Sequence, residues 1–180
     1  MQRVMIIGSC GAGKSTMAVK LSAIIGIAVT HLDTLYWQAG WVEPAIQNWR
    51  QTVQDLALKD TWLIDGNYSR TMDLRIARAD TIIYLDFNRW VCLFNILKRY
   101  FIYRHKTRPD MAVGCPEKID LEFIGYVFNF PNKQRYAIYN QIEQAKDQKN
   151  VIILKSPAAI AHFLKELNNT KHLSKLGKTI

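Results

Sequence analysis

The chain has 180 residues, of which 49% are hydrophobic, and this size and composition are typical of a single globular domain. Its 24 basic residues against 15 acidic ones give a formal charge of +9, which favours anionic partners such as nucleotides, phosphorylated metabolites or nucleic acid. Three widely spaced cysteines, with no C-x-x-C pair, argue against a disulfide framework or a zinc site, so we expect a cytoplasmic protein.

Neither the first residues nor the most apolar segment indicates a membrane protein. Residues 1–7 lead directly into a strand pattern, with no charged leader before it. Residues 90–103 are the most apolar stretch, but Lys98 and Arg99 interrupt it short of the roughly twenty apolar residues that a bilayer crossing needs. We therefore expect no membrane contact, and the sequence leaves the oligomeric state open.

The first predicted strand, Val4–Ile7, leads into a glycine-rich turn and then a helical pattern over residues 14–25 that ends at Gly26. The turn has the form G-x-x-x-x-G-K-[ST], which between a strand and a helix predicts a cradle for nucleotide phosphates. Its glycines let successive N–H groups point inward, and the helix dipole adds a positive end. The residues expected to bind the nucleotide here are Gly8, Ser9, Cys10, Gly11, Ala12, Gly13, Lys14, Ser15 and Thr16.

Two side chains of this turn have expected chemical roles. Lys14 is expected to reach the β- and γ-phosphates and to act in catalysis. Ser15 is expected to offer its hydroxyl to Mg²⁺, which prefers oxygen ligands and usually arrives already bound to the nucleotide.

A second strand, predicted over residues 27–32, ends just before Asp33. Ligands of such sheets bind beyond the carboxyl ends of the strands, so Asp33 is a candidate base and substrate contact that accepts the proton of an acceptor hydroxyl. The alternative is an N-cap for a following helical turn. Tyr36, Trp37 and Trp41 then form an aromatic group that either lines the pocket of a ring-shaped acceptor or belongs to the core.

After a helix predicted over residues 45–59, a third strand over residues 61–65 ends in Asp65, a candidate Mg²⁺ ligand. The alternative for Asp65 is a structural cap of the turn that begins at Gly66. The turn and the short helix after it, residues 72–78, bring further candidate substrate contacts, and their arginines can clamp an acceptor phosphate or the transferring group. These candidates are Asn67, Tyr68, Arg70 and Arg75, with Arg70 also expected in catalysis.

A fourth strand over residues 81–85 is followed by a long insert, about residues 88–148, which is expected to be a helical lid. Its first helix has an apolar face and breaks at Arg108-Pro109, and further helices are expected near 120–128 and 131–148. Arg104 and Arg108 are the expected catalytic arginines of this lid, since such side chains stabilise the charge of a migrating phosphoryl group. Arg99 and Arg135 are candidates by the same reasoning, with surface charge as the alternative.

The chain ends with a fifth strand over residues 151–154, a helix over residues 157–167 and a basic tail, residues 169–180, that we expect to be flexible. Strands that alternate with helices predict a parallel α/β sheet. The domain is therefore expected to span residues 1–168, with the lid inserted in it.

Four motifs together resemble the adenylate-kinase-like branch of P-loop kinases, and within it the bacterial topology modulation (FlaR-like) proteins. They are Gly8 to Thr16, His31 to Trp37 with Gly40-Trp41, Ile64 to Arg70, and Gly114 to Pro116. The resemblance implies a three-layer nucleotide-kinase fold, with a central five-stranded parallel sheet of order 2-3-1-4-5, and ATP with Mg²⁺ as the donor pair. It also implies that adenine lies against the loop after the last strand, where Lys155 is the expected contact.

These features predict an ATP- and Mg²⁺-dependent phosphotransferase, a kinase, for a nucleoside, a nucleotide or a related ring-bearing small molecule. An alternative is an ATP-binding regulator that affects DNA topology or binds nucleic acid through its basic surface, although no motif of a DNA-reading module is present. A plain NTPase is a third possibility, disfavoured because the long insert is suited to excluding water.

Overall fold

The computed structural model describes the backbone of residues 1–176 and the side chains of residues 1–171. A five-stranded sheet lies at its centre, and every strand pairs in parallel with its neighbours in the order β2-β3-β1-β4-β5. The predicted α/β fold class and its 2-3-1-4-5 strand order are therefore confirmed. The strands are β1 (Arg3–Gly8), β2 (Val29–His31), β3 (Trp62–Asp65), β4 (Thr81–Leu85) and β5 (Asn150–Leu154).

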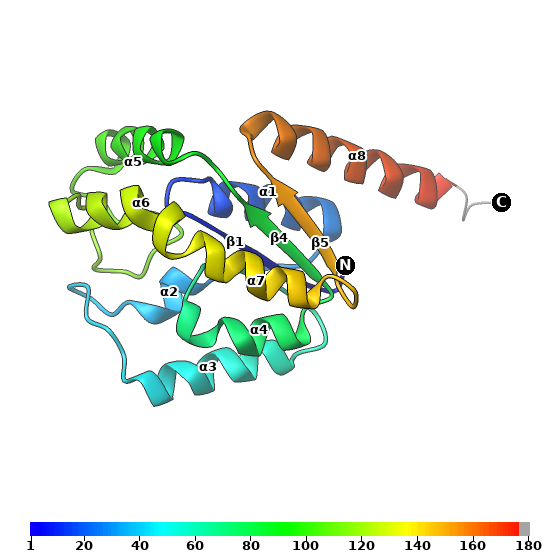
Figure 1. The fold of residues 1–180 in the computed structure, drawn as a ribbon, viewed down its shortest axis with the longest axis horizontal. Coiled ribbons are helices and arrows are strands. Elements are labelled where there is room, and N and C mark those ends of the chain that lie inside the picture. The colour runs from blue at the N-terminus through cyan, green and yellow to red at the C-terminus, as the bar shows by residue number, and fades with distance from the viewer. Residues whose placement is uncertain (177–180) are drawn as a thin grey trace.

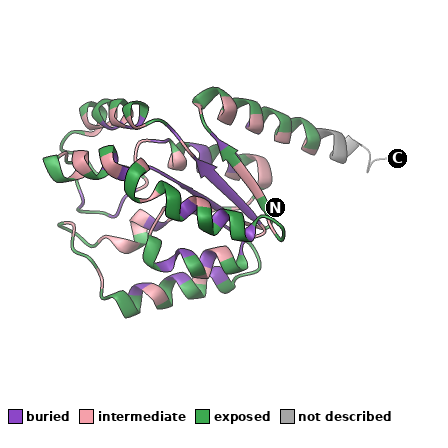
Figure 2. Cartoon of the chain, viewed as in Figure 1, coloured by how far each residue is buried: buried purple, intermediate pink, exposed green. Residues whose placement is uncertain are grey.

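Helices cover both faces of the sheet (Figure 1), and the three central strands β3, β1 and β4 are buried along almost their whole length (Figure 2). In β1, Val4 and Ile6 belong to the core on one face, and Met5 and Ile7 belong to the core on the other. This alternation follows from the two-residue period of a strand, and burial on both faces explains why residues 4–7 are all apolar. The first face packs against α1 (Lys14–Ile25), α5 (Arg89–Tyr103) and α8 (Pro157–Leu176), and the second against α3 (Ile46–Leu58), α4 (Met72–Arg78) and α7 (Arg135–Ala145).

The insert between β4 and β5 consists of α5, α6 (Leu121–Lys133) and α7. Helix α6 joins the two layers, since Val127 belongs to the first core and Phe130 to the second. Pro131, expected to begin a new helix, instead lies in the last turn of α6, and the two helices separate at Gln134. The missing N–H of a proline costs one hydrogen bond there, and the buried apolar face of α6 outweighs this loss.

Helix α8 is longer than its sequence pattern indicates. It continues past Leu167 to Leu176, so residues 169–176, which were expected to belong to a flexible tail, are helical. Helix α8 packs against α1, and Lys171 donates a hydrogen bond to the backbone carbonyl of Ile24 at the end of α1. The rest of the predicted tail, residues 177–180, lies outside the described residues.

The strand β2 is shorter than expected and gives way to the short helix α2 (Leu32–Tyr36). Asp33 therefore lies inside the first turn of α2, while His31 occupies the N-cap position. A short 3-10 turn, η1 (Ser69–Thr71), precedes α4. In the described part of the chain, no helix combines the length and the apolarity that crossing a bilayer requires.

Candidate active site

A cavity of about 1330 Å³ opens at the carboxyl ends of the strands. Its walls come from the glycine-rich turn, the ends of β2 and β3, the loop after β2, and helices α5, α6 and α8. A pocket for one drug-sized ligand typically has roughly 300–1,000 Å³. The cavity is therefore large enough for two ligands side by side, as a transfer reaction requires.

The glycine-rich turn, residues 8–16, which we call the cradle, is shaped by its backbone. Gly11 and Gly13 have φ values of 80° and 86°, in the left-handed region that favours glycine. A Cβ atom on Gly11 would lie 2.3 Å from the backbone oxygen of Cys92, so α5 can approach the cradle only where this side chain is absent. Gly13 is the N-cap residue of α1 and has no side chain that could cap the helix. The N–H groups of the first turn are therefore able to bind an anion.

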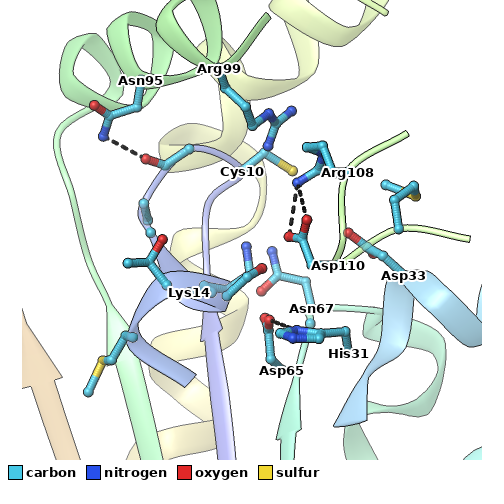
Figure 3. A pocket seen from close by; sticks show the side chains of 18 of the residues that line it. Cys10, Lys14, His31, Asp33, Asp65, Asn67, Asn95, Arg99, Arg108 and Asp110 are labelled. Carbon is cyan, nitrogen blue, oxygen red and sulfur yellow. Dashed lines mark hydrogen bonds and ion pairs between the residues drawn. The ribbon is translucent and has the colours of Figure 1, made fainter. Parts of the chain in front are cut away.

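Most of the predicted nucleotide-binding residues line the cavity, and the first two do not. Gly8 donates its backbone N–H to Oδ1 of Asn67 (2.8 Å), and the Ser9 carbonyl accepts a hydrogen bond from Nζ of Lys14 (3.1 Å). They shape the cradle rather than face the ligand space, which corrects their expected role. The side chain of Asn95 in α5 also holds the cradle, because its Nδ2 donates to the Gly11 carbonyl at 2.8 Å (Figure 3).

Asp65 lies at the floor of the cavity and is paired with His31. Its Oδ2 is 2.7 Å from Nδ1 of His31, and Asp65 is only 4% exposed. The hydrogen bond to Asp65 raises the pKa of His31, although burial opposes this shift. The histidine was not predicted as a site residue, because its pairing with Asp65 arises only when β2 and β3 pair, which makes the two residues direct partners in the register.

Asp33 also lines the cavity and faces the cradle (Figure 3). Its Oδ1 accepts a hydrogen bond from the hydroxyl of Tyr68 at 2.7 Å. Burial raises the pKa of Asp33, while the tyrosine hydroxyl and the charge of Lys14 act in the opposite direction. Asp33 is therefore a partly desolvated carboxylate within the electrostatic reach of the cradle lysine, an arrangement suited to a general base.

Arg75 does not face the cavity, contrary to its predicted role as a phosphate contact. It is fully buried, and its guanidinium donates to the carbonyl groups of Gly66 (2.7 Å), Asn67 and Tyr68 (3.2 Å). These bonds fasten the turn after β3, in which Tyr68 has the unfavourable φ of 38°. Arg75 is thus a structural residue that presents Asn67 and Tyr68 to the cavity, and burial lowers its pKa to about 10.

Aromatic rings form a continuous wall beside Asp33. The ring of Tyr36 lies 5.0 Å from that of Trp37, 4.9 Å from that of Trp49 and 4.6 Å from that of Tyr68. Trp37 in turn contacts Trp41 at 5.3 Å. All five residues line the cavity, while Trp49 is also a core residue with 2% exposure. Ring-to-ring contacts in such T-shaped and tilted geometries are favourable, so this wall is largely preformed.

The predicted arginines divide into two groups. Arg70, Arg99 and Arg108 line the cavity. Arg104 does not line it: this exposed residue directs its Nε to Nε2 of His105 at 3.0 Å. Arg135 is also elsewhere, since it pairs with Asp86 at 2.6 Å. The helix α5 ends at Tyr103, and Arg104 is its C-cap residue.

Lys155, the expected adenine contact, is exposed and does not line the cavity. The preceding residue, Leu154, belongs to the core on the α1 and α8 face. Because side chains alternate along a strand, the next residue turns away from that face. The cavity wall in this region consists instead of α8 residues, namely Pro157, Ile160, Ala161 and Leu164.

Ser15 and Asp65, the predicted Mg²⁺ ligands, both line the cavity. A hydroxyl and a carboxylate are hard oxygen donors, and together with phosphate oxygens they suit Mg²⁺. Among the described residues, no group of three histidines, cysteines or acidic residues is arranged to hold a metal by itself. The donor set therefore fits an ion that shares its ligands with a nucleotide.

No family model matches this chain, and no curated protein matches it either. Among solved structures, it is similar to a shikimate kinase from Bacteroides thetaiotaomicron, with a TM-score of 0.54 and 17% identity over 94% of this chain and 97% of that one. A gluconokinase from Sinorhizobium meliloti 1021 matches with a TM-score of 0.52 and 11% identity over 99% of this chain and 94% of that one.

At these identities the likeness establishes the fold alone. Both neighbours are small-molecule kinases by name, and neither name supports the resemblance to topology modulation proteins. The three-layer α/β fold, with its five-stranded parallel sheet in the order 2-3-1-4-5, is thus the fold that this chain shares with these two kinases.

Proposed function

We propose that this protein is an ATP- and Mg²⁺-dependent kinase that phosphorylates a hydroxyl group of a small, ring-bearing molecule. The observation that carries the proposal is the position of Asp33, a partly desolvated carboxylate that faces the cradle from the opposite wall of one cavity. An alcohol needs a base near its point of attack, whereas a phosphate acceptor is already an anion and needs arginines. Of the predicted acceptor arginines, Arg75 is buried in the scaffold, and only Arg70 remains in the cavity.

In this mechanism the cradle N–H groups and Lys14 bind the β- and γ-phosphates. Asp33 accepts the proton of the acceptor hydroxyl, and the hydroxyl oxygen of the acceptor bonds to the γ-phosphorus. The bond between that phosphorus and the oxygen that bridges it to the β-phosphate breaks, which leaves ADP. Ser15 and Asp65 would hold Mg²⁺, whose charge offsets that of the phosphates. Tyr36, Trp37 and Trp41 would pack against the ring of the acceptor.

The test is ADP release with a panel of nucleosides, nucleotides and hydroxylated metabolites, measured for the wild type and for Asp33→Asn. We expect an alcohol acceptor, with a rate at least about a hundredfold lower in Asp33→Asn, because the variant cannot accept a proton. A monophosphate as the preferred acceptor, or an unchanged rate in Asp33→Asn, contradicts the proposal.

The cavity itself does not account for the basic excess of the chain. Seven basic residues line it, namely Lys14, Lys20, Arg70, Lys98, Arg99, Arg108 and Lys118, and seven acidic residues line it as well: Asp33, Glu43, Asp65, Asp110, Glu117, Asp120 and Glu122. A polyphosphate would therefore be bound by particular side chains, with Lys14 of the cradle first among them, and not by a large net charge of the cavity. Duplex DNA binding that is steeply salt-dependent and is not competed by ATP would instead favour the regulatory alternative.

A further inference from the structure

A chain of ion pairs in the cavity wall joins helix α5 to the loop after it, residues 104–120, which we call the insert loop. The carboxylate of Glu117 is shared: its Oε1 lies 2.8 Å from an Nη of Arg99, and its Oε2 lies 2.7 Å from Nε of Arg108. Arg108 also pairs with Asp110 at 3.0 Å. The Glu117 side chain is only 2% exposed, so water screens these pairs weakly.

Glu117 is anchored by its backbone as well as by its ion pairs. Its N–H donates to the carbonyl of Lys106 at 3.0 Å, and a parallel bridge joins it to Arg104. Nearby, Sγ of Cys115 donates to the carbonyl of Gln38 at 3.1 Å, and this part of the loop packs against Trp37 and Trp41. The carboxylate therefore projects from a segment held at several points.

The two arginines, in contrast, are long side chains with many rotamers. Each guanidinium has five N–H donors, and Glu117 uses at most two of them on either arginine. Both arginines line the same cavity as the cradle, and Figure 3 shows them beside one another next to Cys10. Their remaining N–H groups are available to a bound phosphate.

We infer that Glu117 is a positioning residue that holds Arg99 and Arg108 together as one phosphate-binding pair beside the cradle. The inference rests on the nucleotide site of the proposed function and goes beyond it, since it assigns a role to a buried acid that need not touch the substrate. A fixed carboxylate between two arginines limits their rotamers before the nucleotide arrives, and preorganisation of this kind lowers the entropic cost of binding.

A competing effect has the opposite sign. If Glu117 only neutralised the arginines, its removal would free two positive charges for the phosphates, and nucleotide affinity would rise. Positioning predicts that affinity falls. The direction of the change therefore separates the two roles.

The test is calorimetric binding of a non-hydrolysable ATP analogue with Mg²⁺ to the wild type and to Glu117→Gln. We expect the dissociation constant to rise about tenfold, within the usual range for coupled residues. In the double variant Arg99→Gln/Arg108→Gln, adding Glu117→Gln should change it by less than about twofold, because no arginine is left to position. Unchanged or tighter binding by Glu117→Gln, or an equal loss in the double-variant background, overturns the inference.

Glu143→Gln is the matched control, because Glu143 also forms an ion pair, with Lys146, but its side chain is 67% exposed. We expect Glu143→Gln to bind the analogue with wild-type affinity.

Thermal unfolding checks that each variant is folded. Should Glu117→Gln fail to fold, Glu117→Asp retains the charge but withdraws the carboxylate by one methylene. A weaker analogue affinity in that variant supports the inference, and an unchanged affinity overturns it.

The readout is binding, so the two proposals can fail separately. Analogue binding by the wild type without phosphoryl transfer to any acceptor contradicts the proposed function and leaves the test of Glu117 valid. Wild-type protein that does not bind the analogue contradicts both.

Discussion

The cradle and the insert loop bound the same cavity but are built in different ways. The cradle is shaped by its backbone, through glycines at positive φ and an open helix N-terminus. The insert loop depends on side chains, with Glu117 paired to two arginines and Asp110 paired to one of them. A site made by backbone needs particular residues at particular spacings along the chain, whereas a site made by ion pairs needs only that the partners meet in space.

The cradle has one side chain on which its chemistry is expected to depend, and its removal should have the largest effect. Lys14→Ala is expected to lower the transfer rate by about 10²- to 10³-fold, because it removes a charge directed at the phosphates. The measurement is ADP release at saturating acceptor. Lys59→Ala, at an exposed position after α3, is the control and should retain the wild-type rate. Transfer that does not depend on Lys14 would remove the cradle from the mechanism.

Arg75 tests whether the turn after β3 is held by side chains in the same way as the insert loop. Arg75→Met fills most of the space but leaves the carbonyls of Gly66 and Asn67 without their donor. We expect a loss of about 3 kcal/mol in the free energy of unfolding, because buried acceptors are left unpaired. Chemical denaturation measures it. A loss below about 1 kcal/mol would mean that the turn does not depend on this arginine.

Substitution of two glycines with the same φ separates the cost of backbone strain from the cost of a clash with a neighbouring segment. Gly11 and Gly26 both have a φ of 80°, but a Cβ atom on Gly11 would meet Cys92, while one on Gly26 would meet nothing within 4 Å. Gly11→Ala is expected to weaken binding of the ATP analogue by about tenfold or more, since the cradle must shift. Gly26→Ala should lower stability by about 1 kcal/mol and leave binding unchanged. Equal nucleotide affinity in both variants would contradict a backbone-built site.

The acceptor side should differ from the cradle in its response to pH. Burial raises the pKa of Asp33 above its ordinary value of 3.8, so the folded state favours the protonated form. Asp33 therefore contributes fully to the free energy of unfolding below its unfolded-state pKa, and this contribution is lost as the pH rises through its folded-state pKa. Between these two pKa values the free energy of unfolding should fall less steeply with pH in Asp33→Asn than in the wild type. Denaturant titrations from pH 3 to 8 measure it, and parallel curves for the two proteins would exclude a raised pKa.

The smallest effect is expected at Arg104, which lies in the insert loop but outside the ion-pair chain. Arg104→Gln should change the transfer rate by less than about twofold, since an exposed charge far from the reacting groups contributes little. Arg108→Gln, measured alongside, should lower the rate at least about tenfold. A wild-type rate in Arg108→Gln would show that this arginine of the insert loop has no part in catalysis.

The fold was largely predictable, because its signals are local. The bounds predicted for α1, α4 and β4 agree with the structure, since glycines, caps and apolar periodicity act within a few residues. The end of β2 was predicted wrongly, because Leu32 suits a strand and a helix equally, and in the structure it is the first residue of α2. The continuation of α8 past Leu167 depends on its packing against α1, which the residues of α8 do not encode by themselves.

The site was predictable in part. Residues 10–16 of the cradle, Asp33, Asp65, Arg70 and the aromatic wall do line the cavity, whereas Gly8 and Ser9 do not. Arg75, Arg104 and Lys155 were expected to line the cavity and do not. The sequence around a charged residue does not show whether its side chain faces a ligand, the protein interior or solvent. His31 and Glu117 were not predicted, since their partners are distant in sequence.

The amino-acid sequence by itself determined the order of the strands and helices and the place of the phosphate cradle, because glycine spacing and apolar periodicity are properties of adjacent residues. The tertiary structure alone decided which charges meet: Asp65 with His31, Glu117 with Arg99 and Arg108, and Arg75 with the carbonyls of a turn. The physical reason is that an ion pair depends on distance and burial, and both arise only when separate elements pack together.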